Sequence, residues 1–456
     1  MAVNTTEGGL SAPTRHNIDW KEKKFYDKIA IDDELSRVFE ACHGCRRCVS
    51  LCQSFPTLFD LIDESENFDL ESVDKKDYGK VVDECYLCDL CYQTKCPYVP
   101  PHEWAIDFPH LMLRAKAEKF NNNEKNKNKI IKLRNYFLSS TDKLFSSLSK
   151  PVIANIVNFI FSRKIMRIIL ENILKIHRNA DLPKMSPLNL KKRLKRLNLN
   201  IVDYKDIVKT DKTEGKVKLF ATCYCSNSTP EIAEDLIKVF VHNNIHIEIF
   251  GQENCCGMPK LELGDLKSVE DLKNKNIPNL VKAIKDGYDI VSPVPSCVLM
   301  FKQELPLLFP NDEDVKLVQK SIFDPFEYLN LRDEEGLFNE DFKESKGKIA
   351  YQTACHQRVQ NFGPKTKSIL SKIPESEITM IERCSGHDGT YAIKLESFEN
   401  SVKIRRPVVS RIKKDSYKIF TSDCPMAAKH IGNDLNSNEI DIKLHPISIL
   451  KSAYRI

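Results

Sequence analysis

Two dense runs of cysteine lie within the first hundred residues of this 456-residue chain. The first run holds Cys42, Cys45, Cys48 and Cys52, and the second holds Cys85, Cys88, Cys91 and Cys96, followed by Pro97. Cysteine thiolates are the standard protein ligands of iron–sulfur clusters and are also common ligands of zinc. Thiols separated by two residues, and then by a longer step, therefore indicate metal chemistry rather than scattered core cysteines.

The spacing predicts two 4Fe–4S clusters whose ligands are exchanged between the runs. Three thiolates at two-residue intervals bind one cluster, and the fourth, a few residues later, ligates the other cluster in two-cluster ferredoxins. We therefore expect one cluster on Cys42, Cys45, Cys48 and Cys96, and the other on Cys52, Cys85, Cys88 and Cys91. Pro97 suits this arrangement because it cannot continue a helix and turns the chain away directly after a ligand.

Both runs depart slightly from the usual motif. Four residues, not three, separate Cys91 from Cys96, and no proline directly follows Cys52. Two zinc knuckles would use the same eight thiolates and are the alternative to clusters. A disulfide framework is disfavoured, because a large cytoplasmic chain keeps its thiols reduced. Arg46 and Arg47 lie between ligands, where they either offset the negative charge of a cluster or remain solvated.

The other eight cysteines begin at Cys223, after a long interval without cysteine, and they belong to an internal repeat. The intervals agree between the two copies: Cys223–Cys255 spans 32 residues and Cys355–Cys384 spans 29, while Cys256–Cys297 spans 41 and Cys384–Cys424 spans 40. Each cysteine falls in a loop after an apolar strand. Open α/β sheets place their ligand sites at that edge, so two related lobes would bring their loops together around one shared site.

The fold class follows from the same repeat. Strands read as KVKLF, IHIEIF and DIVSP in the first copy and as GKIAYQ, ITMIE and YKIFT in the second, with helices between them near 230–243 and 277–286 in the first copy. Strands that alternate with helices indicate a parallel sheet in each copy. We therefore expect an α/β multidomain protein in which a helical, dicluster ferredoxin-like domain precedes two α/β repeats.

Five segments are expected along the chain. They are an N-terminal tail over 1–30, the dicluster domain over 31–115, a helical linker region over 116–215, the first repeat over 216–342 and a second, degenerate repeat over 346–456. In the linker region, 121–129 is a polar run that suits a solvated loop or the frayed start of a helix. Residues 151–162 and 164–176 show apolar residues at helical spacing. These helices either pack on the core or form a docking surface for a partner subunit or a membrane, with Lys164, Arg167 and Lys175 facing lipid headgroups.

The paired cysteine runs, followed by two copies built on the signature Cys255-Cys256-Gly257, resemble the iron–sulfur C subunits of anaerobic glycerol-3-phosphate dehydrogenases. The chain is also similar to CCG-domain heterodisulfide reductase subunits and glycolate oxidase iron–sulfur subunits. The resemblance to the first family extends from about Cys42 to Ile456 and includes the stretch ILKIHRNADLPKMSP and the end LHPISIL. It implies a protein that accepts electrons from a flavoprotein and passes them toward a quinone or a membrane partner.

The repeats depart from the family pattern. The first copy offers Cys223, Cys255, Cys256 and Cys297, with Met300 where the family has a further cysteine and with Cys225 as a substitute for Cys223. The second copy offers Cys355, Cys384 and Cys424, with Ser385 and Ala427 in cysteine positions, and with His356 or His387 near enough in sequence to supply a nitrogen. Three interpretations stay open: a third iron–sulfur cluster or zinc at the first copy, a site shared by both copies, or reduced thiols without metal.

Composition excludes several other functions. The net charge of +5 is too small for this length to indicate nucleic-acid binding. No apolar signal segment begins the chain, and the run at 151–162 is too short to span a bilayer, so we expect a cytoplasmic protein, or one peripheral at the inner face of the cell membrane. No Gly-rich nucleotide or flavin motif follows a strand. The sequence thus predicts an electron-transfer subunit of an oxidoreductase; a heterodisulfide or thiol reductase acting at the repeat loops is the alternative, and a zinc-stabilised scaffold is a third class.

Overall fold

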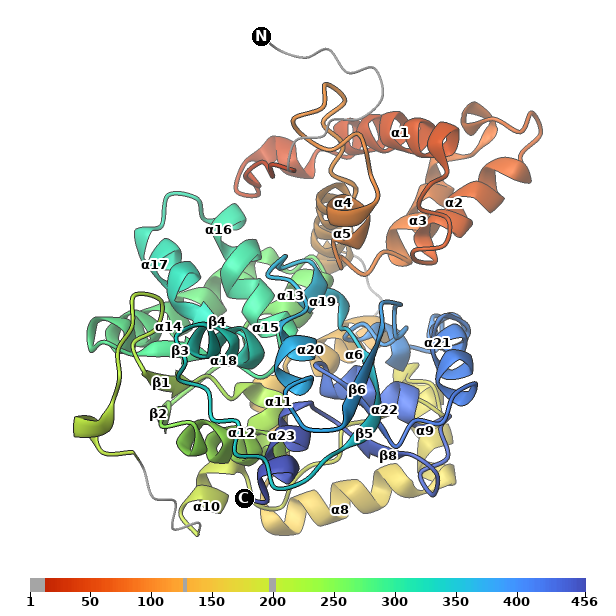
Figure 1. The fold of residues 1–456 in the computed structure, drawn as a ribbon. Helices are drawn as coiled ribbons and strands as arrows, with labels where there is room; N and C mark the ends of the chain where they lie inside the picture. Colours follow the sequence, from red (N-terminus) through yellow and green to blue (C-terminus); the bar gives the residue numbers. More distant parts are fainter. Residues whose placement is uncertain (1–12, 126–128, 197–201) are drawn as a thin grey trace.

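The structure is a computed structural model that describes residues 13–125, 129–196 and 202–456. Residues 1–12 of the expected N-terminal tail and 126–128 of the polar run lie outside the described residues. The chain forms a helical N-terminal part above two side-by-side α/β units (Figure 1).

The N-terminal part is built from short helices around an aromatic and aliphatic core. These helices are α1 (Lys28–Cys45), α2 (Ser54–Asp63), α3 (Tyr78–Asp83), α4 (Leu90–Thr94) and α5 (Phe108–Lys125). The side chain of Asp27 accepts hydrogen bonds from the backbone N–H groups of Ile29 and Ala30, which fixes the start of α1. Phe39 and Phe55 are fully buried beside Phe108, so α1, α2 and α5 share one core. This core holds both cysteine runs in place.

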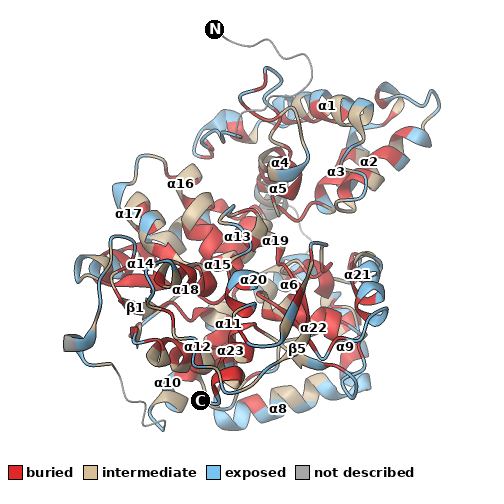
Figure 2. Ribbon diagram, viewed as in Figure 1, coloured by how far each residue is buried: buried red, intermediate tan, exposed pale blue. Residues whose placement is uncertain are grey.

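The linker helices follow in the order α6 (Lys129–Ser139), α7 (Thr141–Leu148), α8 (Pro151–Ser162), α9 (Lys164–Leu174) and α10 (Leu190–Leu194). Helix α8 lies along the lower edge of the molecule in Figure 1, and Figure 2 shows most of its surface exposed or half-buried. Large apolar side chains face solvent on α8 and α9, including Val152, 70% exposed, and Ile165, 71% exposed.

The docking-surface alternative requires Lys164, Arg167 and Lys175 to be exposed, and the structure contradicts it for Arg167. Lys164 and Lys175 are exposed. Arg167 is buried, and its guanidinium donates hydrogen bonds to the backbone carbonyls of His177, Arg178 and Ala180. Arg167 therefore ties α9 to the segment that follows it, because the chain folds back over the end of this helix. Among the described residues, no single helix is long and apolar enough to cross a membrane; α7 and α8 together meet the length and composition test but are bent by 108°.

The first α/β unit contains β1 (Lys216–Leu219), β2 (His246–Ile249), β3 (Asp289–Val291) and β4 (Ile322–Phe323) in one parallel sheet, in the spatial order β2-β1-β3-β4. Its helices are α11 (Thr222–Asn227), α12 (Pro230–His242), α13 (Met258–Glu262), α14 (Leu266–Lys285), α15 (Pro295–Leu299), α16 (Leu305–Leu308), α17 (Glu313–Ser321) and α18 (Pro325–Glu334), with a π-helical turn over Met300–Glu304. The parallel pairing confirms the α/β fold class predicted from the sequence.

The second unit repeats this topology. Its strands β5 (Gly347–Gln352), β6 (Ser376–Ile381), β7 (Ile419–Ser422) and β8 (Asp441–Lys443) form a parallel sheet in the order β6-β5-β7-β8. Its helices are α19 (Cys355–Arg358), α20 (Lys365–Leu370), α21 (Phe398–Lys413), α22 (Pro425–Gly432) and α23 (Ile447–Tyr454). In both sheets the first strand of the copy lies between the second and the third. The strand order thus reverses beside β1 and β5, where such sheets place their ligand sites.

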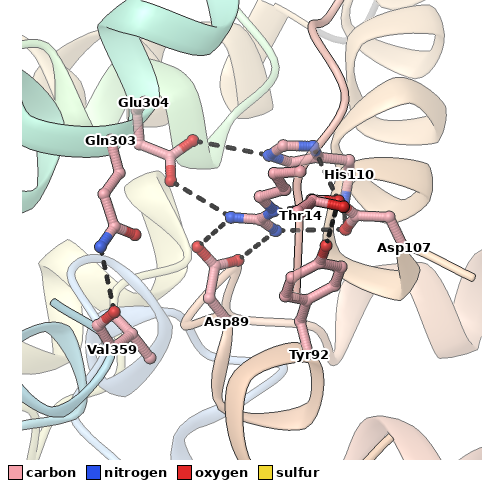
Figure 3. A network of polar contacts seen from close by, with 9 residues as sticks. Thr14, Asp89, Tyr92, Asp107, His110, Gln303, Glu304 and Val359 are labelled. Carbon is pink, nitrogen blue, oxygen red and sulfur yellow. Dashed lines mark hydrogen bonds and ion pairs between the residues drawn. The ribbon is translucent and has the colours of Figure 1, made fainter. Parts of the chain in front are cut away.

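A buried polar network joins the N-terminal part to the first α/β unit (Figure 3). Arg15 pairs with Asp89 at 2.5 Å, with Asp107 at 2.9 Å and with Glu304 at 3.8 Å. His110 lies between Asp107 and Glu304, at 3.1 Å and 3.9 Å. Trp20 adds a contact by donating to the carbonyl of Leu308 at 3.1 Å. The described part of the expected tail is therefore packed between these two parts of the fold.

Candidate metal centre

The first cysteine run is placed by the end of a helix. Cys42 and Cys45 occupy the last turn of α1, and Arg46 ends it in a left-handed conformation, with φ of 50°. Cys48 and Cys52 follow in the turn before α2. Because α1 stops within the run, the chain wraps its thiols around one region instead of spacing them along a helix.

The second run is held by an irregular loop. Cys85 follows α3, Cys91 lies in α4, and Cys96 comes just after that helix. Leu87 and Asp89 adopt positive φ angles of 54° and 61°. Such angles are costly for residues other than glycine, and the Asp89–Arg15 ion pair holds this loop in place. Lys116 also donates from Nζ to the carbonyl of Cys85 at 2.5 Å.

Cysteines of the two runs lie near one another in the folded chain. The pKa of Cys42 is raised by burial, and next by the nearby thiols of Cys96, Cys48 and Cys45. The pKa of Cys52 is raised by burial, and next by Cys85 and Cys88 of the other run. The assignment of ligands to clusters stays a prediction, but Cys52 and Cys96 each lie with the other run.

The two groups are neighbours. The thiols acting on Cys91 are Cys85, Cys88, Cys52 and, from the other group, Cys48. Burial raises the pKa of Cys85 to about 12, and burial followed by Cys96 and Cys45 raises that of Cys48 to about 12. Four thiolates gathered in a buried site repel one another, so these groups need a bound cation to ionise.

The donor atoms of this centre are all cysteine sulfurs. Across residues 13–125, 129–196 and 202–456, no three cysteine, histidine or acidic side chains converge closely enough to enclose one metal ion. The donor set, entirely sulfur and half-buried or buried, fits iron–sulfur clusters.

The two arginines between the ligands have different surroundings. Arg46 forms an ion pair with Asp63 at 2.5 Å and lies over the ring of Phe59. Arg47 acts on the Cys48 thiol and lowers its pKa, against the larger effect of burial. Of the two, only Arg47 keeps its charge directed at the thiols, because Asp63 neutralises Arg46.

Four cysteines of the first repeat, Cys223, Cys255, Cys256 and Cys297, line the same cavity. The pKa of Cys255 is lowered by its contacts with Cys223 and Cys256, and that of Cys256 is raised by Cys255 and Cys297. Thr141 of α7 contacts two of these thiols, with its Oγ1 3.2 Å from the Cys223 sulfur and 3.6 Å from the Cys255 sulfur. These are the four thiols that the sequence predicts for a third site.

Cys225, considered as a substitute for Cys223, lies elsewhere. It is fully buried, with its sulfur 4.0 Å from the hydroxyl of Thr229 at the start of α12. Cys223 lines the central cavity and Cys225 does not. The two side chains diverge because α11 begins at Thr222 and turns successive residues to different faces.

The cysteines of the second repeat divide into a pair and a single thiol. The pKa of Cys355 is raised by its contacts with Cys384 and with Cys88 of the N-terminal part, and next by burial. Cys384 accepts a hydrogen bond from the backbone N–H of Gly386 at 3.3 Å, and its pKa is lowered by the Cys355 contact. The Cys424 thiol, whose pKa is raised by burial to about 11, accepts hydrogen bonds from the backbone N–H groups of Ala427 and Met426 instead.

All of these loops line one cavity of about 420 Å³. Its walls are the inner faces of α7, α8 and α9 on one side and the cysteine loops of both repeats on the other, with Cys88 also exposed to it. Most of the lining is apolar, including Leu144, Phe145 and Val157. The cavity therefore joins the sulfur atoms of both repeats to those of the second run.

The two histidines considered as ligands are held by other groups. His356 shares a hydrogen bond with Ser296 across the two repeats, 2.8 Å from its Nδ1, and burial lowers its pKa to about 4. The ring of His387 packs edge-on against His430 at 5.7 Å, and burial likewise lowers its pKa to about 4. Both line the cavity as neutral imidazoles.

Sequence reasoning missed Thr141 and the Arg15 network. Thr141 stands in the helical linker, more than eighty residues before the nearest thiol of the first repeat, so no local motif marks it. Arg15 is isolated in a segment that looks like a polar tail. Only the pairing of distant elements brings these residues to the sulfur loops.

The first repeat matches a family model described as a cysteine-rich domain, over residues 217–302. The chain carries a CCG domain. The C subunit of anaerobic glycerol-3-phosphate dehydrogenase from Escherichia coli K12 is 27% identical over 330 residues, covering 70% of this chain and 77% of that protein. Lactate utilization protein A of Oceanobacillus iheyensis is 26% identical over 253 residues, covering 53% of this chain and 98% of that protein.

A third relative is the B subunit of fumarate reductase (CoM/CoB) from Methanothermobacter marburgensis, 23% identical over 248 residues, covering 53% of this chain and 47% of that protein. These matches confirm the resemblance inferred from the cysteine runs and the CCG domain. The CCG domain and its relatives support iron–sulfur clusters and a redox partner subunit for this chain.

Proposed function

We propose that this chain is an iron–sulfur electron-transfer subunit of an oxidoreductase. The observation that supports it best is the proximity of two four-thiol groups, with Cys48 near enough to Cys91 to raise its pKa. Cys88 then continues this sulfur array toward Cys355 and the repeat loops. Electron transfer needs closely spaced redox centres in a buried site, and the thiols provide ligands for such a series.

Two 4Fe–4S clusters would be held by Cys42, Cys45, Cys48 and Cys96 and by Cys52, Cys85, Cys88 and Cys91. When bound, such clusters supply reversible one-electron transfer. The chain's own residues position and shield them: α1 ends within the first run, Lys116 holds the backbone at Cys85, and the core of Phe39 and Phe55 keeps water from the thiols. Arg47 would offset part of the negative charge.

A third cluster at Cys223, Cys255, Cys256 and Cys297 is part of this proposal, because these thiols already contact one another. Thr141 would then donate its hydroxyl to a ligand sulfur, which favours the reduced state of a cluster. Zinc at the same four thiols is the alternative occupant.

The partners we propose are a flavoprotein that donates electrons and a membrane-linked acceptor such as quinone. The exposed apolar face of α8 and α9 supports the second, since Lys150, Arg163 and Lys164 border it and suit anionic headgroups. On this proposal the chain works in the cytoplasm, at the inner face of the membrane. The flavoprotein would choose the substrate.

A second function, reduction of a heterodisulfide or another thiol compound at the repeat loops, is favoured by one observation. The cavity exposes the cysteines of both repeats to a shared apolar space that would hold a small molecule. Ser385 in place of a cysteine weakens this interpretation, because the second repeat then lacks a complete set of thiolates.

A reductive titration tests the main proposal. We expect anaerobically purified protein to take up one electron for each of two clusters, with EPR signals that broaden each other because the two groups are adjacent. Uptake of three electrons would add the third cluster. Uptake of no electron by protein whose thiols are metal-bound would overturn the proposal.

A further inference from the structure

The second repeat places two cysteines at equivalent positions on neighbouring strands. Strands β5 and β6 are paired in parallel, with Gln352 opposite Ile381 at their carboxyl ends. Cys355 and Cys384 each follow the last paired residue by three positions. Because the two strands are hydrogen-bonded neighbours, equal offsets bring these two cysteines to the same edge of the sheet, where both line the central cavity. The Cys384 contact is the first cause of the raised pKa of Cys355.

The backbone of the loop around Cys384 fixes the position of its sulfur. Gly386 has φ of 75°, and a side chain at this position would meet the carbonyl of Ser401 at 2.3 Å. Its N–H points at the Cys384 sulfur, 3.3 Å away. Ser385 stands where the signature has a second cysteine and accepts a hydrogen bond from the backbone of His387. The substitution leaves a pair of thiols here instead of a four-thiolate set.

The pair also contacts the N-terminal part. Cys355 and Cys88 line the same cavity, and Cys88 is one of the groups that raise the pKa of Cys355. Cys52 lies within electrostatic range of Cys384. The proposed function makes Cys88 and Cys52 ligands of one cluster, so the pair lies directly beside that cluster. Cys424, the third cysteine of the repeat, is held by backbone N–H groups and does not share these contacts.

We propose that Cys355 and Cys384 are a redox-active dithiol that closes reversibly to a disulfide and exchanges electrons with the adjacent cluster through Cys88. This inference rests on the proposed function, which supplies the electrons. Reduction breaks one S–S bond, and each sulfur takes one electron and one proton. Electrons arrive singly through Cys88, and protons come from water, because both cysteines are only partly buried. The pair thus stores two electrons that arrive one at a time.

The chemistry of the pair suits this role. A thiol that lies beside a sulfur fixed by a backbone N–H, as Cys355 lies beside Cys384, is arranged for disulfide exchange. When the disulfide forms, Cys355 loses its S–H, which changes the surroundings of the Cys88 sulfur. Hydrogen bonds to ligand sulfurs change the reduction potential of a cluster. Oxidation of the Cys355–Cys384 pair should therefore shift the reduction potential of the cluster on Cys88.

Differential alkylation tests the pair directly. Anaerobically purified, iron-loaded protein is equilibrated in buffers of oxidised and reduced dithiothreitol at set ratios, alkylated, and digested for mass spectrometry. We expect Cys355 and Cys384 to become protected from alkylation together, and their protection to follow the buffer potential as a two-electron process. The digest should contain a peptide pair linked by the Cys355–Cys384 disulfide. Cys424 should stay unlinked throughout.

Variants complete the test. Cys384→Ser and Cys355→Ser should each abolish the linked peptide while keeping the iron content, and Cys355→Ser should also shift the EPR signal of the cluster on Cys88. Cys225→Ala is the matched control, because this buried cysteine faces Thr229 and lies outside the cavity. It should change neither readout.

Two results would overturn the inference. These are independent oxidation of the two cysteines and an unchanged thiol titration in Cys384→Ser. Failure of the proposed function looks different, since the wild-type protein would then lack iron and EPR signals whether or not the disulfide forms.

Discussion

At the scale of single residues, Cys52 is the cysteine that best distinguishes crossed from uncrossed ligand assignments. It stands in the first run but lies among the thiols of the second. Spacing predicted this exchange, because the last cysteine of each run follows a longer step and points away from the first three. The contacts of Cys355 and Thr141 were beyond sequence reasoning, since they join segments more than eighty residues apart.

Changing Cys52 to serine should damage the cluster on Cys85, Cys88 and Cys91 and leave the other largely intact. Serine is a poor substitute for a thiolate ligand, so about half of the dicluster EPR intensity should be lost or altered. Cys45→Ser is the matched variant and should affect the other signal. Loss of the same signal in both variants would contradict the crossed assignment.

His110 should make stability depend on pH. Burial and Arg15 oppose its protonation, but Asp107 and Glu304 more than offset them and raise its pKa to about 9. A raised folded-state pKa contributes stability that is complete below the unfolded value of about 6.5 and is lost as pH rises through about 9. Each unit of pKa shift corresponds to about 1.4 kcal/mol, so the upper limit is roughly 3 kcal/mol.

The measurement is the apparent Tm between pH 6 and 10 for wild type and His110→Gln. We expect the higher apparent Tm of the wild-type protein, relative to His110→Gln, to fall toward that of the variant as pH rises from 6.5 to 9. The charged groups that surround this histidine are Arg15, Asp89, Asp107 and Glu304. A difference between the two proteins that is constant over this range would show that the imidazole does not titrate there.

At the scale of elements, the first three strands of each repeat were predictable from the sequence, and the fourth strand was not. The strands β1, β2 and β3 and their counterparts β5, β6 and β7 are apolar and end at cysteine loops. The fourth strands, β4 and β8, have two and three residues, too few for an alternation to be visible. Arg167 was expected at a headgroup surface because position along α9 alone does not reveal the carbonyls that fold over it.

The exposed face of α8 and α9 should bind anionic membranes. Phe159 is 58% exposed on α8, and burying such a side chain contributes about 2 kcal/mol. Phe159→Glu should therefore weaken co-sedimentation with phosphatidylglycerol-containing vesicles by about tenfold or more. The control is Asn155→Asp on the same helix, which adds a charge without removing an apolar side chain. Equal vesicle binding by the wild type, Phe159→Glu and Asn155→Asp would exclude this face as a membrane-binding surface.

At the scale of the whole molecule, the N-terminal part and the two repeats meet through buried polar contacts. Arg15 joins α4 and α5 to the first repeat, while Glu84 accepts hydrogen bonds from Tyr391 and Asn400 of the second. These contacts hold Cys88 against Cys355. Sequence analysis predicted the parts in their order, but the relative placement depends on isolated charged residues that carry no pattern.

Arg15→Gln should loosen this assembly. It leaves Asp89, Asp107 and Glu304 without their shared cation in a buried site, and breaking a buried ion pair costs about 3–5 kcal/mol. We expect a lower apparent Tm and faster proteolysis between the N-terminal part and the first repeat. Arg37→Gln, which removes a surface pair with Glu34, should stay within about 0.5 kcal/mol of wild type. Equal stability of the two variants would contradict the role given to the network.

The central claim is that the two N-terminal cysteine runs bind iron–sulfur clusters that carry electrons, and metal analysis tests it most directly. Iron, acid-labile sulfide and zinc should be measured on anaerobically purified protein. We expect about eight irons with an equal amount of sulfide per chain, or about twelve if the first repeat also holds a cluster. Zinc in their place, with neither iron nor sulfide, would contradict the account.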